Sequence, residues 1–440
     1  MQIGPLILYS ALAGALTGVL AAGFTYLLGL LQQYLMGELL GYFPPGLSGE
    51  GGLAQMFRGP AFPALALLLP ILFAASSYLG SGRGLGWLLA AYRQGQRVRA
   101  VQYFRGIIGA LVQLGAGSPM GREGPMAALG LWIGGALGRR FPLGEAGKFL
   151  PFAGMAAGFA SAFHAPMAGA LLASEIVYRG LALEVGALAP ALIGALAGFT
   201  VYGLFHGYGP LLELQASPLE WSSLAFGLVL GLVCAGVGSL WLEGERLLRH
   251  PLRRLSFPVR HGIFGLLLGI VLLLFPEALG NALPWVQLGT SPILSLPFLG
   301  VLFLVQLALL LFGGGVRAYG GQLTPALTLG GLAGLLLAQF IPWLAPPPEV
   351  AALAGMSALL AGVARAPFAA IVLVGETSGY SLLPLVLLAA FSAYTFTSPQ
   401  GSFEVGDLTP EGSDGLTEPP TETSPRTSPP PPNPSGHDAP

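Results

Sequence analysis

Two charged residues, Arg122 and Glu123, lie within the apolar, glycine-rich stretch from Gly115 to Gly130. A charged side chain at membrane depth costs roughly 2.5–3.5 kcal/mol on insertion scales, so residues of this kind usually face a cavity or a pathway. Glu123 is therefore the first candidate functional residue. A structural alternative stays open, in which Glu123 only caps the next helix or pairs with Arg122.

The residues around Glu123 predict the start of a broken helix. Gly121, Gly124 and Pro125 are typical of a loop, and the apolar run MAALGLWIGGALG that follows predicts a helix. Proline suits the first helical turn because its missing N–H costs nothing there. The other amides at a helix start are unpaired donors at the positive end of the helix dipole, and anions are their natural ligands. Glu123 would then be a tethered anion at such a site.

An internal repeat indicates that this arrangement occurs twice. The segment from Gly154 to Glu175 matches the segment from Gly355 to Glu376 at nine of 22 positions, with an offset of 201. Upstream landmarks pair at an offset of 200: Gly121 with Gly321, Pro125 with Pro325, and Gly130 with Gly330. Proteins built from such repeats often place a substrate site where broken helices of the two halves meet.

The second half therefore contributes its own helix start. The motif GGQLTP, from Gly320 to Pro325, is the counterpart of GREGP and again precedes an apolar run. Two such starts converging from opposite halves would form a dehydrated anion site without a cationic side chain. Ser81, which lies between two glycines, could add a hydroxyl donor or could simply end a helix.

Composition defines the elements that must position these residues. The chain has 440 residues, of which 54% are hydrophobic and 9% are charged, with a mean hydropathy of +0.72. Soluble domains carry about 25% charged residues, so we expect an all-α polytopic membrane protein in a lipid bilayer. The single cysteine, Cys234, excludes an internal disulfide and a metal site built from several cysteines. Neither a cofactor nor a metal is expected.

The expected elements follow from the apolar runs. They are a long first helix from Met1 to Met36, a span from Ala61 to Leu79, a basic amphipathic connection from Trp87 to Arg105, and helices at Gly147–Phe163, Met167–Tyr178 and Leu183–Phe205. Three groups of basic residues mark cytoplasmic loops or helix ends by the positive-inside rule, and we expect no nucleic-acid partner. The groups are Arg93, Arg97, Arg99 and Arg105; Arg139, Arg140 and Lys148; and Arg246, Arg249, Arg253, Arg254 and Arg260.

The domain organisation separates a membrane part from a tail. Residues 1–403 form the predicted membrane domain, with a first repeat at about 1–210 and a second at about 217–403. Residues 404–440 contain ten prolines, nine serines or threonines and a net charge of −6. Such a segment buries too little apolar surface to fold alone, so we expect disorder.

These motifs resemble one known family. GSG at Gly80–Gly82, GREGP at Gly121–Pro125, the HAPMAGALLASE segment and GGQLTP occur in the order of the chloride-pathway motifs of CLC chloride channels and chloride/proton antiporters, the prokaryotic type without CBS domains. The resemblance covers roughly Pro5 to Phe403. It implies two inverted repeats of broken, tilted helices, a homodimer with one pore per subunit, and a place in the bacterial inner membrane.

The resemblance also assigns roles to residues. Glu123 matches the gating glutamate, whose carboxylate competes with chloride and moves aside when protonated. Ser81 matches the serine that contacts chloride, and the amides around Glu123 and Gly124 and of Gln322 and Leu323 match the helix-end donors. The residue at the position of the family's pathway tyrosine is Phe403, with Tyr394 as a nearby substitute.

One departure leaves the proton path open. The family's inner proton glutamate falls at Ile176, and its neighbour matches Glu175. Either Glu175 or water serves instead, or coupling is lost and the protein is a chloride channel; Glu175 could equally be a buried structural acid. His164 is expected to be a polar helix-end residue. An intramembrane enzyme is disfavoured because no aspartate precedes Asp407 and no HExxH or GxSxG motif occurs. A structural scaffold would not explain two broken helices at matched offsets.

Overall fold

The computed structural model describes residues 3–46, 66–79, 84–93, 98–141, 143–177, 181, 183–214 and 220–399. Almost all of this part of the chain is helical, and its one β-bridge is the isolated antiparallel pair of Gly121 and Gly321. Six helices in the described ranges are long and apolar enough to cross a membrane. The all-helical, polytopic fold expected from composition is confirmed.

The described residues before position 215 form eight α-helices. They are α1 (Ile3–Gln32), α3 (Leu68–Leu79), α4 (Leu85–Arg93), α5 (Ala100–Gly115), α6 (Glu123–Arg140), α7 (Leu150–Phe163), α8 (Pro166–Glu175) and α9 (Val185–His206), with a π-helical turn, η1 (Gln33–Leu39), and a 3₁₀ turn, η3 (Gly144–Phe149). Helices α8 and α9 are the last two helices within the first predicted repeat.

Residues 220–399 form eight more. They are α10 (Trp221–Leu252), α11 (Phe257–Leu274), α12 (Leu283–Gly289), α13 (Leu296–Val316), α14 (Leu323–Phe340), α15 (Pro348–Ala364), α16 (Pro367–Ser378) and α17 (Leu383–Phe396), with 3₁₀ turns η4 (Pro276–Ala278) and η5 (Tyr380–Leu382). Helices α6, α7 and α8 correspond in order to α14, α15 and α16.

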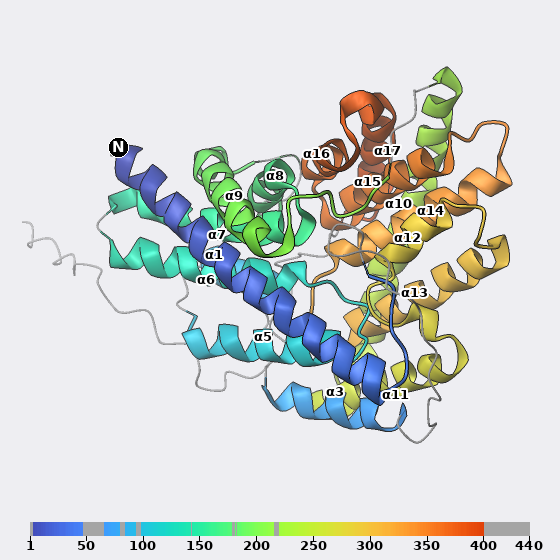
Figure 1. Ribbon diagram of the computed structural model, residues 1–440, viewed down its shortest axis with the longest axis horizontal. Helices are drawn as coiled ribbons and strands as arrows, with labels where there is room; N and C mark the ends of the chain where they lie inside the picture. The colour runs from blue at the N-terminus through green and yellow to red at the C-terminus, as the bar shows by residue number, and fades with distance from the viewer. Residues whose placement is uncertain are drawn as a thin grey trace, which may run out of the picture.

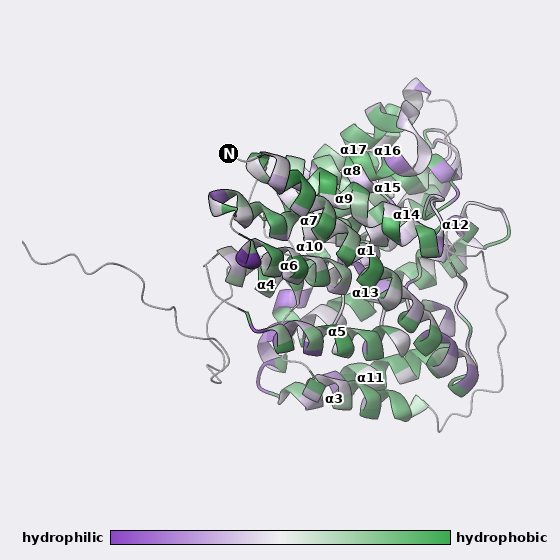
Figure 2. Cartoon of the chain, turned by 60° about the vertical axis from the view of Figure 1, so that its left-hand side comes forward, coloured by the Kyte–Doolittle hydropathy of each residue, from purple (hydrophilic) through white to green (hydrophobic). Residues whose placement is uncertain are grey.

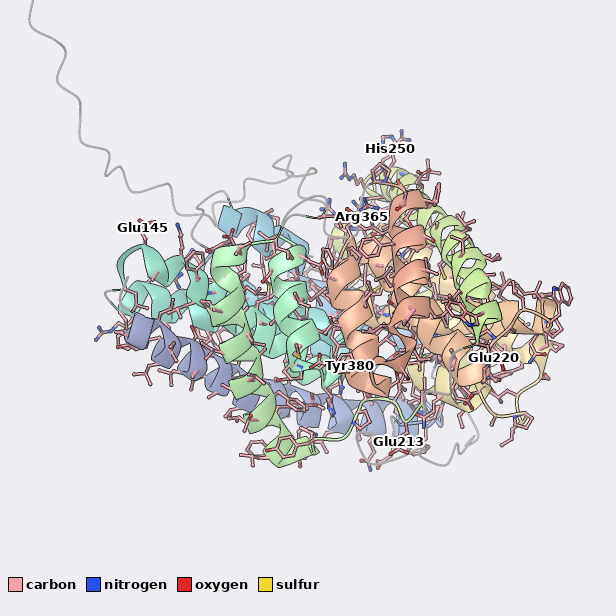
Figure 3. The ribbon with its side chains drawn as sticks, turned by 90° about the horizontal axis from the view of Figure 1, so that it is seen from above. Glu145, Glu213, Glu220, His250, Arg365 and Tyr380 are labelled. Atoms are coloured by element: carbon pink, nitrogen blue, oxygen red, sulfur yellow. The ribbon has the colours of Figure 1, made fainter. Side chains whose placement is uncertain are left out.

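Helices α1 and α5–α9 lie on one side of the molecule, and α10, α12 and α14–α17 lie on the other (Figure 1). Figure 2 shows helices that are mostly apolar, with hydrophilic residues towards their ends. Viewed from above, His250 and Arg365 lie at one edge and Glu213 at the opposite edge (Figure 3). A bilayer would therefore meet the apolar middle of the helices, with the polar ends in the two interfaces.

Small residues let the central helices pack at backbone contact. Every residue of α7 and nearly every residue of α15 is buried. A Cβ atom on Gly130 would overlap the backbone at Gly154, and a Cβ on Gly330 would overlap the backbone at Gly355. Helices in membranes associate through such small residues because lipid offers no hydrophobic drive between helices. The α6–α7 and α14–α15 contacts thus repeat at matched glycines.

Some predicted boundaries were wrong. The stretch predicted as one basic connection from Trp87 to Arg105 contains helix α4 and the start of α5, because the LGWLLAAYR sequence is apolar enough to pack. The first α-helix ends at Gln32 and continues as a π-helical turn. Helix α8 ends at Glu175. The predicted acidic tail at 404–440 lies outside the described residues.

Candidate anion site

Helices α6 and α14 begin beside each other. The amide of Gly121 donates to the carbonyl of Gly321 at 2.8 Å, and the amide of Gly321 donates back to the carbonyl of Gly121 at 2.7 Å. From this pair α6 and α14 extend to opposite sides of the molecule (Figure 1). Two helix starts, with their free amides and positive dipole ends, therefore meet at one point in the interior.

The carboxylate of Glu123 occupies this junction. Its Oε1 accepts from the amides of Leu323 at 2.8 Å and Thr324 at 3.1 Å, and its Oε2 accepts from the Thr324 hydroxyl at 2.6 Å. The residue is fully buried. The Arg122 side chain donates to the carbonyl of Ala162 instead. Glu123, at the first turn of α6, thus binds the first turn of α14, two hundred residues further along the chain.

Glycines make room for this carboxylate. A Cβ atom on Gly121 or on Gly321 would overlap the Glu123 side chain, and a Cβ on Gly124 would lie 3.0 Å from Gly321. Only glycine fits where another backbone or a side chain comes this close. The glycines of both motifs are therefore required by the junction itself.

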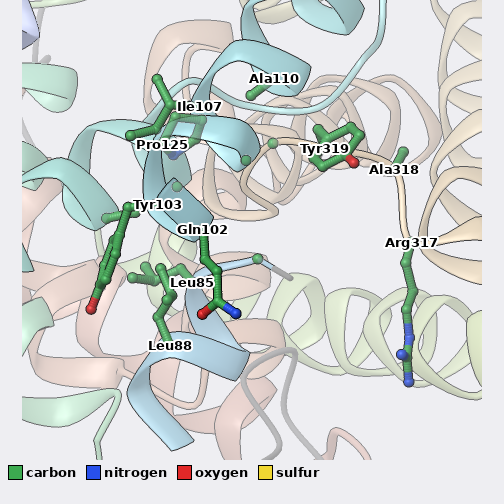
Figure 4. Close-up of a pocket in the computed structure, with 15 residues that line it drawn as sticks. Leu85, Leu88, Gln102, Tyr103, Ile107, Ala110, Pro125, Arg317, Ala318 and Tyr319 are labelled. Carbon is green, nitrogen blue, oxygen red and sulfur yellow. The ribbon is translucent and has the colours of Figure 1, made fainter. Parts of the chain in front are cut away.

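A half-open cleft lies next to the junction. Its lining includes Gly124 and Gly320 from the two helix starts, together with Gln102 and Tyr103 of α5. Figure 4 shows Tyr319 and Arg317 on the other side from Tyr103. Residues next to both helix starts therefore line the same cleft.

The remaining predicted ligands fall into three groups: at the junction, outside the described residues, and on α17. Gly124, Gln322 and Leu323 lie at the junction, and Leu323 donates its amide to Glu123. Ser81 and Phe403 lie outside the described residues. Tyr394, on α17, packs its ring against the Arg365 guanidinium, 3.8 Å from the ring centroid, and its carbonyl accepts from the same side chain.

Glu175 belongs to a reciprocal pair of helix caps. Its carboxylate accepts from the amides of Phe368 at 3.0 Å and Ala369 at 2.7 Å, at the start of α16. Glu376, at the end of α16, accepts from Met167 at 2.9 Å and Ala168 at 2.7 Å, at the start of α8. Each helix therefore ends in a carboxylate that caps the other, and we call this pair the α8–α16 clamp.

His164 and Ile176 each lie directly after the end of a helix. His164 ends α7 in a left-handed conformation, and its Nδ1 lies 2.7 Å from the carbonyl of Gly209, as a polar helix-end residue would. Ile176 directly follows the last residue of α8 and is buried. An aliphatic side chain at this position offers no group for proton transfer.

Two polar residues at or near the junction were missed by the sequence reasoning. Thr324 lies inside the GGQLTP motif, but its hydroxyl was not considered as a donor. Glu245 of α10 was overlooked because it lies within a strongly basic helix end. The available signal was a glutamate four residues before Arg249, a spacing that places the two side chains on the same face of a helix. Within the described part of the chain, no three His, Cys, Asp or Glu residues gather to hold a metal ion.

The fold and site define a multi-pass integral membrane protein in which broken helices present amides to a buried anionic group. The sequence model described as "Voltage gated chloride channel" matches residues 64–398. That is more than half of the chain, and the protein therefore belongs to this family.

Relatives and solved structures agree with this assignment. The chain is 32% identical to the voltage-gated ClC-type chloride channel ClcB of Salmonella dublin, over 65% of this chain and 70% of that protein. It is 29% identical to the H(+)/Cl(-) exchange transporter ClcA of Salmonella paratyphi B, over 87% and 83%. The fold matches a slow cyanobacterial Cl⁻/H⁺ antiporter with a TM-score of 0.76 at 23% identity, covering 89% of this chain and 93% of that one. A CLC-type fluoride/proton antiporter matches equally well, at 92% and 98% coverage. The CLC fold expected from the motifs is confirmed.

Proposed function

We propose that this protein transports chloride across a bacterial inner membrane in exchange for protons, with Glu123 as the gate. The observation that carries the proposal is the carboxylate of Glu123 bound to the amides of Leu323 and Thr324. A carboxylate and a halide are both anions that accept N–H bonds at helix starts. The same donors can therefore bind one or the other, and not both.

Protonation supplies the switch in this proposal. A neutral carboxyl group accepts weaker hydrogen bonds than a carboxylate does, and it has no charge to interact with the two helix dipoles. Chloride then displaces it from Leu323 and Thr324, and the protonated side chain swings away carrying its proton. Release of that proton returns the carboxylate to the junction. Gly124 and Gln322 contribute further backbone donors, and Ser81 and Phe403 remain predicted contacts.

Glu175 is assigned to the α8–α16 clamp in this proposal. Both of its oxygens accept amide hydrogen bonds at the start of α16, which is the arrangement of a helix cap. Releasing those bonds in every transport cycle would expose the amides of Phe368 and Ala369, which would need new partners. We therefore expect the Glu175 side chain to stay bound to α16 while the Glu123 side chain moves.

Ile176 favours a second candidate, an uncoupled chloride channel. The position lacks a titratable group and is buried. Without an inner proton acceptor, protonation of Glu123 would open the pathway but would not move protons across the membrane. The two candidates share the anion site and differ only in proton movement.

One experiment separates them. The purified protein is reconstituted in liposomes with a chloride gradient, and chloride efflux and proton uptake are recorded together. Proton uptake against a proton gradient, driven only by chloride, is expected for the antiporter. Chloride efflux without proton uptake identifies the channel, and absence of chloride flux contradicts both.

The resemblance further implies a homodimer with one pathway per subunit, which we carry forward as a proposal. Light scattering of the detergent-solubilised protein measures its protein mass directly. Twice the chain mass of 45.3 kDa is the expected value. The proposal includes neither an enzymatic activity nor a cofactor.

A further inference from the structure

Three carboxylates are buried among the described residues: Glu123, Glu175 and Glu245. Glu123 lies at the anion junction and Glu175 in the α8–α16 clamp. Glu245, on α10, caps neither helix of the clamp and does not bind the amides that hold Glu123. An ionisable residue within a membrane helix is costly to bury and is a functional candidate by default. Glu245 is therefore the carboxylate that needs an explanation.

The surroundings of Glu245 connect it to the anion junction. Its Oε2 accepts from the side-chain amide of Gln322 at 3.0 Å. Gln322 is the N-cap residue of α14, and the amides of the next two residues bind Glu123. The segment from Gln322 to Thr324 therefore contacts both carboxylates. The Gln322 side chain binds Glu245, and the amides of Leu323 and Thr324 bind Glu123.

The other side of Glu245 leads to the basic edge of the molecule. Its Oε1 accepts from Arg249 Nη2 at 2.8 Å, and the Arg249 side chain is 23% exposed. Helix α10 continues from there to His250 at the edge shown in Figure 3, which the positive-inside rule places in the cytoplasm. Glu245 thus lies between cytoplasmic water and the segment that holds the gate.

Helix α13 is shaped around this carboxylate. A Cβ atom on Gly314 would overlap the Glu245 carboxyl group, so any other residue there would push it away. Arg317, which follows α13, is the second cation near Glu245, and Gln322 faces it from the start of α14. The neighbouring helices therefore surround Glu245 with polar and charged groups and leave space for it.

We propose that Glu245 is the inner carboxylate that exchanges protons with the cytoplasm and with Glu123. This inference rests on the proposed chloride/proton exchange. A proton from cytoplasmic water binds Glu245, and it then transfers to Glu123, so that Glu245 returns to a carboxylate and Glu123 becomes a carboxylic acid. No electrons move. Arg249 keeps contact with solvent while Glu245 is neutral, so the ion pair can open without leaving a charge stranded in apolar surroundings.

Other titratable residues fit this role less well. Glu175 caps α16 with both oxygens. His261, on α11, places its Nδ1 2.9 Å from the carbonyl of Phe257, and its ring packs against Tyr319. Neither contacts the segment from Gln322 to Thr324 through a hydrogen bond in the described structure. Among the buried carboxylates of the described residues, Glu245 alone has both an ion pair with a partly exposed cation and a hydrogen bond from that segment.

The test compares Glu245→Gln with Glu243→Gln in proteoliposomes. Glu243 is an exposed glutamate on the same helix and is the matched control. The measured quantity is the number of protons moved per chloride under a chloride gradient. Glu245→Gln keeps the size of the side chain but cannot take up a proton, and we expect the ratio to fall at least tenfold. Glu243→Gln is expected to match the unaltered protein.

The outcomes are decisive in both directions. If the unaltered protein is coupled and Glu245→Gln keeps its ratio, the inference is wrong while the proposed antiport stands. If the unaltered protein moves no chloride, the proposed function itself fails. Should Glu245→Gln not fold, Glu245→Asp keeps a titratable group at a shifted position. A changed pH of half-maximal proton flux in Glu245→Asp supports the inference, and an unchanged pH profile overturns it.

Discussion

At the scale of single residues, the site depends on how strongly α14 holds the Glu123 carboxylate. Three donors reach it, two amides and the Thr324 hydroxyl, in a fully buried position. Hydrogen bonds to a charged group contribute about 1.5–3 kcal/mol each, more than neutral ones. Any change to these donors therefore changes the balance between the carboxylate and a competing anion.

Replacing Glu123 itself tests the gate. Glu123→Gln keeps the shape but has no charge to release or regain, so chloride-driven proton movement should fall below detection and chloride flux should no longer depend on pH. The measurement is paired chloride and proton flux between pH 4 and pH 8. A variant that still responds to pH as the unaltered protein does would remove Glu123 from the mechanism.

Thr324→Val tests the donor that sequence reasoning missed. Loss of one hydrogen bond to the carboxylate removes about 1.5–3 kcal/mol from its bound state, and each 1.36 kcal/mol corresponds to one pH unit. Chloride should then displace the side chain at a higher pH, so the half-maximal pH of transport should rise by about one to two units. Thr200→Val is the control, because Thr200 is an exposed residue on α9 whose hydroxyl donates to the carbonyl of Leu196 in the same helix. A half-maximal pH that stays fixed, or falls, would contradict the role of the hydroxyl.

Sequence could predict Glu123 and its partners because glycine and proline mark a helix start without reference to tertiary structure. It could not predict the Thr324 hydroxyl or Glu245, since both act through contacts between segments 77–201 residues apart. The predicted positions of Ser81 and Phe403 stay predictions. For Glu175, the alternative of a structural acid agrees with its two amide contacts at the start of α16.

At the scale of helices, the clamp and the glycine contacts hold the two broken helices in place. Helix boundaries were predicted well on the two sides of Pro166: the helix predicted to end at Phe163 ends there, and the helix predicted to start at Met167 starts one residue earlier. They were predicted poorly at α4, where apolar packing outweighed the basic character of the stretch. Amino-acid composition alone does not predict which other helices a short helix packs against.

Glu175→Gln and Glu376→Gln should destabilise the protein to a similar extent. Each removes a charge from a carboxylate bound to two amides at a helix start, and we expect a loss of about 2 kcal/mol of unfolding free energy. The midpoint of thermal unfolding in detergent measures it. Neither substitution should alter the number of protons moved per chloride. A loss of coupling in Glu175→Gln alone would move Glu175 from the clamp to the proton path.

Gly154→Val tests the backbone contact between α6 and α7. The added carbons would overlap the carbonyl of Gly130, which belongs to the helix that carries Glu123. Overpacking of this kind costs about 1–3 kcal/mol, so the thermal midpoint should fall. Gly236→Ala, where a Cβ meets nothing within 4 Å, is the control and should be neutral or slightly stabilising. Equal stability of both variants would show that the two helices can separate without cost.

At the scale of the whole molecule, the proposed proton route requires the basic edge to face the cytoplasm. The positive-inside rule assigns that orientation from Arg246, Arg249 and Arg253 near one end of α10. Glu213 lies at the opposite edge (Figure 3). Cys234, the single cysteine of the chain, is buried. The unaltered protein should therefore not be labelled by a membrane-impermeant maleimide.

Cysteines placed at the two edges report the orientation in intact cells. Glu213→Cys and His250→Cys replace exposed residues, and an impermeant maleimide should label only the first until the membrane is permeabilised. Labelling of His250→Cys in sealed cells would place the α10 end outside. Glu245 would then receive protons from the external side, and the direction of the proposed proton transfer would be reversed. Labelling of both sites in sealed cells would mean that both orientations coexist, in which case a single direction of transfer could not be assigned.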